Sequence, residues 1–104
     1  MSRRAIHPGE ILAEELAEFE VTPTELARQL KVPANRITQI IQGKRSISGD
    51  TALRLGHWFG TSGQFWLNLQ SAHDIRVAAR ESGSVIARLP VRPTGRTRRR
   101  HTAA

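Results

Sequence analysis

The chain has 104 residues, with 16 Lys and Arg side chains against 9 Asp and Glu, so its formal charge at pH 7 is +7. The absence of cysteine excludes disulfides, thiolate metal ligands and a cysteine nucleophile. No apolar run reaches the roughly 18 residues that span a bilayer, and the N-terminus lacks the pattern of a secretion signal. We therefore expect a soluble, cytoplasmic, single-domain protein without a membrane partner.

The positive charge is concentrated at the C-terminus. Residues 1–83 carry a net charge of +1, whereas residues 84–104 carry six arginines and no acid. Proline and small polar residues fill this second segment, and we expect it to be disordered from about residue 90. The sequence therefore predicts a folded domain over 1–83 and an Arg-rich flexible tail over 84–104. Within the domain, residues 26–49 contain basic side chains and no acid, which indicates a local basic patch.

Apolar spacing and capping signals predict two helices in the first third of the chain. Residues 8–19 place apolar side chains on one helical face, and Pro8 suits the first turn of a helix. Thr22 and Glu25 have the spacing of a capping box around a proline, which predicts a two-turn helix ending near residue 30.

Three further helices follow. Pro33 opens the third helix, which we expect to end at Gln42 with Gly43 as a left-handed cap. Ser48 and Gly60 bound the fourth helix, in which Gly56 costs about 1 kcal/mol relative to alanine. For the fifth helix, expected from about residue 62 to Arg80, the capping-box spacing is carried by Thr61 and Gln64. No strand is expected before the tail.

The second and third helices with their short connection have the pattern of a helix-turn-helix. Ala27 is small where the two helices must approach, and Lys31 falls where a positive φ usually favours glycine. The apolar positions of the motif are Leu26, Leu30, Val32, Ile37 and Ile40. We therefore expect an all-α fold, a compact five-helix domain of the helix-turn-helix type.

The third helix has an uncharged polar face opposite its isoleucines. Amide side chains offer a donor and an acceptor together, which matches the major-groove edge of adenine, and threonine can contact thymine. The residues predicted to contact bases are Asn35, Thr38, Gln39 and Gln42. The alternative is the ordinary solvated face of a soluble helix.

Cations and hydroxyls flank this face where the DNA backbone should pass. The residues predicted to contact phosphates are Thr24, Arg36, Lys44, Arg45 and Ser46. Together the two sets assign base edges to the helix and phosphates to its surroundings.

The fifth helix is apolar on two sides. Phe65, Trp66 and Leu69 lie on one side, which can pack on the domain itself. The opposite side predicts a homodimer interface formed by Leu67, Ile75 and Ala78, since two helix-turn-helix units must reach successive major grooves. The alternative is that residues 85–89 fold back and cover this side.

The first helix carries Glu10, Glu14 and Glu18 four residues apart on one side. Like charges at this spacing repel one another, so a basic partner is one explanation. A solvated helix face is the other.

The sequence does not favour an enzyme. Its four histidines are far apart, no HExxH occurs, and neither a G-x-S-x-G turn nor a Gly-rich phosphate loop is present. We expect no catalytic residue, cofactor, metal or small-molecule substrate.

Three segments resemble a known family. They are HPGEIL at 7–12, GKRSIS at 43–48 and TSGQFWLNLQ at 61–70, and together they are similar to HigA-type addiction-module antitoxins, a branch of the Xre/Cro, lambda-repressor-like helix-turn-helix proteins. The match covers about residues 5–81 and departs from the family at Lys31, Pro33 and Gly56.

The resemblance implies a homodimer that binds the double-stranded operator of its own operon, represses that operon and neutralises a RelE-like mRNA-cleaving toxin. Two alternatives stay open. One is a solitary Xre-type repressor without a toxin; the other is nonspecific nucleic-acid binding by the tail, with the domain used only for dimerisation.

Overall fold

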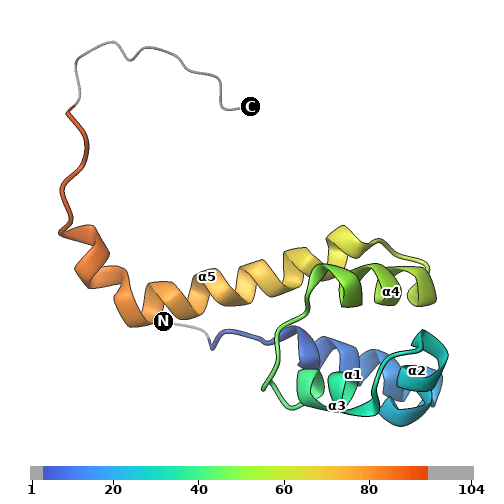
Figure 1. Ribbon diagram of the computed structural model, residues 1–104. Coiled ribbons are helices and arrows are strands. Elements are labelled where there is room, and N and C mark those ends of the chain that lie inside the picture. The colour runs from blue at the N-terminus through green and yellow to red at the C-terminus, as the bar shows by residue number, and fades with distance from the viewer. Residues whose placement is uncertain (1–3, 94–104) are drawn as a thin grey trace.

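The computed structural model describes residues 4–93, which form five helices and no strand (Figure 1). The helices are α1 (Pro8–Phe19), α2 (Pro23–Leu30), α3 (Ala34–Ile41), α4 (Gly49–Phe59) and α5 (Gly63–Ala87). The expected all-α, five-helix fold is confirmed. No helix within residues 4–93 is long and apolar enough to cross a membrane.

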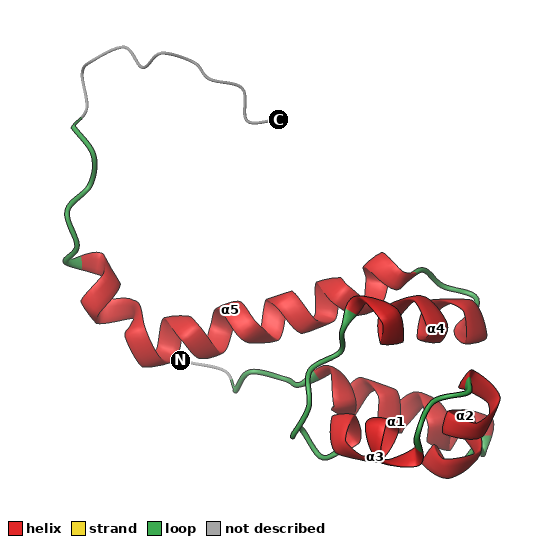
Figure 2. Ribbon diagram, in the orientation of Figure 1, coloured by secondary structure: helices red, strands yellow, loops and turns green. Residues whose placement is uncertain are grey.

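Helices α1, α2 and α3 form one group, and α4 packs along the first half of α5 above them (Figure 2). The last turns of α5 project away from the other four helices (Figure 1). All five helices contribute to one buried apolar core, which consists of Leu12, Leu16, Leu26, Ala27, Leu30, Ile37, Ile40, Ile47, Ala52, Leu55 and Trp66.

The predicted bounds of the first four helices agree with the structure to within a residue. The predicted end of the fifth helix near Arg80 is wrong, because α5 continues to Ala87. No proline interrupts residues 81–89, and the single Gly83 costs only about 1 kcal/mol in a helix. The helix thus crosses the domain boundary expected at residue 83. Residues 94–104 of the expected tail lie outside the described residues.

Two predicted capping boxes are wrong in detail. The Thr22 hydroxyl accepts from the Glu25 amide, but the Glu25 side chain binds Arg28 and Gln29 instead of returning to the cap. At α5 the cap is Ser62, whose hydroxyl accepts from the Phe65 amide at 3.1 Å. Competing side-chain contacts decide both cases: Glu25 binds residues of the next helical turn, and the Thr61 hydroxyl accepts from Trp66.

A capping box that was not predicted opens α1. Nδ1 of His7 accepts a hydrogen bond from the Gly9 amide at 2.9 Å, and the Glu10 carboxylate accepts one from the His7 amide. The His7 ring also lies edge-on to His73 of α5, with ring centroids 4.8 Å apart. Burial and the charge of His73 lower the pKa of His7, although Asp74 and Glu10 oppose the shift.

Two glycines are required where helix backbones approach closely. A Cβ on Gly9 would overlap the carbonyl group of Ile40 at the end of α3. A Cβ on Gly56 would overlap the backbone of Ser62 and Gly63, so this glycine, which looks like a defect within α4, permits the tight turn into α5. Gly49 has open space around it and imposes no such limit.

We expect Gly9→Ala to lower the free energy of unfolding by about 3 kcal/mol or more, because the rigid backbone of Ile40 cannot yield to the added methyl group. The matched control Gly49→Ala should stay within about 0.5 kcal/mol of the wild type. Urea denaturation followed by tryptophan fluorescence measures both. Equal stability of the two variants would contradict the close approach.

We expect the free energy of unfolding to decrease as the pH falls from 7.5 through the ordinary histidine pKa of about 6.5. The folded state holds His7 unprotonated at Nδ1, so the unfolded state binds the proton more readily and stability rises with pH. His7→Asn retains a capping side chain that does not titrate. Denaturation midpoints at pH 5.5 and 7.5 should therefore differ less in this variant, and an unchanged difference would exclude His7 as the cause.

Candidate DNA-binding surface

The turn between α2 and α3 fixes how α3 faces solvent. Lys31 ends α2 in the left-handed region, with φ of 61°, as its position predicted, and the Val32 amide donates to the Ala27 carbonyl at 3.0 Å. Pro33 is the N-cap of α3 and has no side chain that could cap the helix. Ile37 and Ile40 are fully buried, so the opposite side of α3 faces outward.

The residues predicted to contact bases come from this outward side. Asn35 and Gln42 are exposed and form no side-chain hydrogen bond within the described part of the chain. Thr38 is half-buried, and its hydroxyl donates to the helix backbone at Ala34 and Asn35. Gln39 accepts from Nε of Arg45 at 3.0 Å, so its amide is already held in one orientation.

The loop after α3 places the predicted phosphate contacts beside this side of the helix. Gly43 has φ of 76°, the left-handed conformation that was expected of it, and the Lys44 amide donates to the Gln39 carbonyl at 2.8 Å. Lys44, Arg45 and Ser46 are exposed. Thr24, in the first turn of α2, is exposed as well.

Arg36 is less available than the sequence predicted. Its guanidinium forms an ion pair with Asp50 of α4 at 2.9 Å, and 28% of its side chain is exposed. The same carboxylate oxygen accepts from Arg54, which also donates to the Leu30 carbonyl. Hydrogen bonds from Arg54 and then Arg36 lower the pKa of Asp50, so the pair stays charged at neutral pH.

Gln70, which the sequence analysis missed, anchors the loop after α3 to α5. Its side chain is buried, its Oε1 accepts from the Ile47 amide at 2.7 Å, and its Nε2 donates to Asp74 at 2.9 Å. Gln70 follows Trp66 by one helical turn, so both point into the domain. A polar residue at an inward position of the fifth helix was the available signal.

A second polar network flanks the surface at α2. Hydrogen bonds from Arg28 and Gln29 lower the pKa of Glu25 to about 2, and Nε1 of Trp58 donates to Gln29 at 2.7 Å. Arg28 is thus paired, whereas Lys31 and Lys44 form no ion pair among the described residues.

The residues predicted for dimerisation do not share one uncovered face. Leu67 packs against the core of its own domain, while Ile75 is 68% exposed and Ala78 is exposed. Covering of this side by residues 85–89 is excluded, because residues 85–87 continue α5 as a helix.

The predicted acidic contacts also differ among themselves. Glu10 is bound by Arg4 at 2.8 Å, which lowers the pKa of the glutamate, whereas Glu14 and Glu18 are exposed and form no ion pair with the described residues.

Comparisons with known proteins agree with this geometry, although no protein-family model matches the chain. The chain is 43% identical over 88 residues to Virulence-associated protein I of Dichelobacter nodosus, which covers 84% of this chain and 82% of that protein. An addiction module antidote protein of the HigA family from Coxiella burnetii has 51% identity and a TM-score of 0.84, with 86% of this chain and 98% of that chain covered. Pseudomonas aeruginosa antitoxin HigA, solved with the higBA promoter, has 47% identity and a TM-score of 0.81, covering 84% and 97%.

A short capped helix, a tight turn, and a second helix with an outward amide face beside exposed cations define a helix-turn-helix DNA-binding protein. At these identities and coverages, the chain belongs to the HigA family of addiction-module antitoxins. The resemblance read from the three sequence segments is thereby confirmed. Since members of this family are DNA-binding antitoxins and transcription regulators, the expectation that the chain is not an enzyme is confirmed too.

Proposed function

We propose that this chain is a homodimer that binds the operator of its own toxin–antitoxin operon, represses transcription there and neutralises a RelE-like toxin. The observation that carries the proposal is the uncharged outward side of α3 beside the exposed cations of the following loop. Such a protein would act in the cytoplasm at the nucleoid. The P. aeruginosa antitoxin solved with its promoter supports operator binding.

In this proposal Asn35, Thr38, Gln39 and Gln42 contact bases in the major groove. Asn35 and Gln42 need not break a side-chain hydrogen bond to do so. Gln39 shares its oxygen with Arg45, so the loop cation orients the amide that reads the base.

Phosphate contacts come from Thr24, Lys44, Arg45 and Ser46, which are exposed around α3. Arg36 reaches a phosphate only by leaving Asp50, so we rank it below the loop cations. Because the proposed base contacts are uncharged side chains, sequence preference and salt dependence should belong to different residues.

We expect the double substitution Asn35→Ala and Gln39→Ala to reduce the preference for the operon's own promoter over a scrambled duplex by at least about tenfold, since a good bidentate base contact supplies about 1–3 kcal/mol. Affinity for the scrambled duplex should change little. Lys44→Ala, which leaves the Gln39–Arg45 hydrogen bond intact, should weaken binding to both duplexes alike and reduce the slope of log affinity against log salt by nearly one.

Fluorescence anisotropy over a series of KCl concentrations measures both effects. Asn35→Ala alone serves as a control that leaves the Gln39–Arg45 hydrogen bond intact. Loss of promoter preference in the Lys44 variant, with retention in the amide variant, would overturn the assignment.

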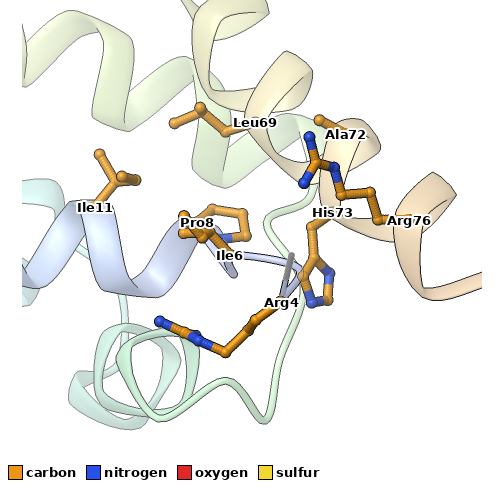
Figure 3. Close-up of a pocket in the computed structure, with 8 residues that line it drawn as sticks. All are labelled: Arg4, Ile6, Pro8, Ile11, Leu69, Ala72, His73 and Arg76. Carbon is orange, nitrogen blue, oxygen red and sulfur yellow. The ribbon is translucent and has the colours of Figure 1, made fainter. Parts of the chain in front are cut away.

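The proposed dimer uses the projecting half of α5. Ile75 and Ile86 are more than half exposed and lie on one side of the helix with Ala72 and Ala79, at spacings of three, four and seven residues. Next to Ala72, this apolar side of α5 borders a groove of about 250 Å³ that lies between the start of α1 and α5 (Figure 3). Exposed Ile6 forms part of the lining of this groove. A second copy is the simplest cover, because dimerisation also supplies the second DNA-reading helix.

We expect Ile75→Glu together with Ile86→Glu to convert the protein to a monomer at about 10 µM. Both side chains are exposed within one chain, so the circular dichroism spectrum should not change. Operator affinity should fall by about 10²-fold, because the two half-sites are no longer bound as a unit. Ser84→Glu, on the opposite side of α5, is the matched control. Sedimentation velocity decides, and a wild-type monomer would refute the dimer.

The toxin part of the proposal is supported by membership of an antitoxin family and by exposed glutamates on α1. If the wild-type chain binds its promoter but captures no product of the adjoining gene, the alternative of a solitary repressor is favoured.

A further inference from the structure

An apolar groove of about 200 Å³ lies at the C-terminal end of α1, against the turn that joins α4 to α5. Helix α1 contributes one side through residues four apart, and the α4–α5 turn contributes the other. Its lining residues are Ile11, Glu15, Phe19, Phe59, Thr61, Phe65 and Trp66. No part of this groove belongs to α2, to α3 or to the loop after α3.

Aromatic rings dominate the groove, and two of them remain open to solvent. Phe19 is 56% exposed and Phe65 is 42% exposed. The ring centroids of Phe19 and Phe59 are 6.0 Å apart, and those of Phe59 and Trp66 are 5.3 Å apart. Trp66 is fully buried. Buried Trp66 and half-buried Phe59 contact the exposed rings, so the groove presents accessible aromatic surface that is packed against the core.

Carboxylates without ion-pair partners surround the groove on α1. Glu15 lines it, Glu14 and Glu18 are exposed on the same helix within one turn of Glu15, and exposed Glu20 is the C-cap residue of the helix. None of the four forms an ion pair with a described residue, in contrast to Glu10. Their mutual repulsion disfavours the free helix face and is relieved when a cation approaches.

We propose that this groove binds an arginine-bearing segment of the toxin, with the guanidinium between the Glu15 and Glu18 carboxylates and the ring of Phe19. Guanidinium groups both pair with carboxylates and stack on aromatic faces, which is the chemistry this groove offers. The inference rests on the proposed function and refines it. It replaces Glu10, which Arg4 already neutralises, by Glu15 as the acidic contact.

The groove and the proposed operator contacts share no residue. An acidic surface also repels DNA phosphates, which disfavours contact between this groove and the operator. Toxin capture and operator binding are therefore separable by substitution.

The test is co-expression of the full chain with the product of the adjoining gene, followed by measurement of the affinity of the purified proteins by titration calorimetry. Phe19→Ser should weaken the complex by at least about tenfold, since an exposed aromatic anchor is lost. Glu15→Gln with Glu18→Gln should weaken it at low salt and flatten its salt dependence. Promoter affinity should remain unchanged in both variants.

Two matched controls come from elsewhere on the surface. Leu53→Ser removes an apolar side chain that is 69% exposed, and Glu81→Gln removes an exposed acid of α5. Both should leave capture unchanged. If the Phe19 and Glu15 variants bind the toxin with wild-type affinity, the groove is not the toxin-binding site. If the wild-type chain captures no toxin at all, the proposed function is overturned.

The other candidate occupant is the Arg-rich segment 94–104 of this chain. A synthetic peptide of residues 91–104 probes it through tryptophan fluorescence, since Trp66 lines the groove and the Trp58 ring contacts Phe19. Micromolar peptide binding that is lost in Phe19→Ser, combined with unaffected toxin capture, would assign the groove to the chain's own C-terminus and refute the toxin site.

Discussion

The backbone contact between Gly9 in the first turn of α1 and Ile40 in the last turn of α3 sets the arrangement of the domain. Because Gly9 lacks a side chain, the start of α1 can lie directly on the Ile40 carbonyl. The residue that caps this turn, His7, also contacts His73 of α5 and lies beside Gly43, where the loop after α3 begins. This junction therefore holds α1, the end of α3, the loop after α3 and α5 in fixed positions relative to one another. It thereby determines which side of α3 faces outward.

Most of the fold was predicted because helix periodicity and capping depend on residues that are close together in the sequence. The periodicity of α1 to α4, the caps at Thr22 and Ser48, and the left-handed Lys31 follow from neighbouring residues alone. The errors arise where the contacts of individual side chains decide. Thr61 was assigned as a cap, yet its hydroxyl accepts from the indole of Trp66 while Ser62 caps the helix. Leu67 could be placed inward only once the position of the core relative to α5 was known.

The candidate site was predicted by residue type but not by pairing. Side-chain character alone distinguished the amides of α3 from the cations of the loop. The sequence could not reveal that Asp50 of α4 holds Arg36 of α3, or that Arg45 orients Gln39, because the positions of these partners depend on how the helices and the loop after α3 are arranged. Arg4 and Arg28 each pair with a glutamate, and Arg36 and Arg54 share Asp50, so the folded domain presents fewer free cations than its composition indicates.

Three separate surfaces then bear on regulation: the outward side of α3, the projecting half of α5 and the aromatic groove at the end of α1. Because they share no residue, an occupant of the groove cannot compete with DNA for a contact. It can act only by changing the total charge, by clashing with the duplex or by altering the spacing of the two DNA-reading helices. A basic occupant covers carboxylates of α1 and adds positive charge to the complex. This change in total charge strengthens the attraction to DNA phosphates. Weakened repression by a bound toxin would therefore require a steric or geometric cause strong enough to exceed that attraction.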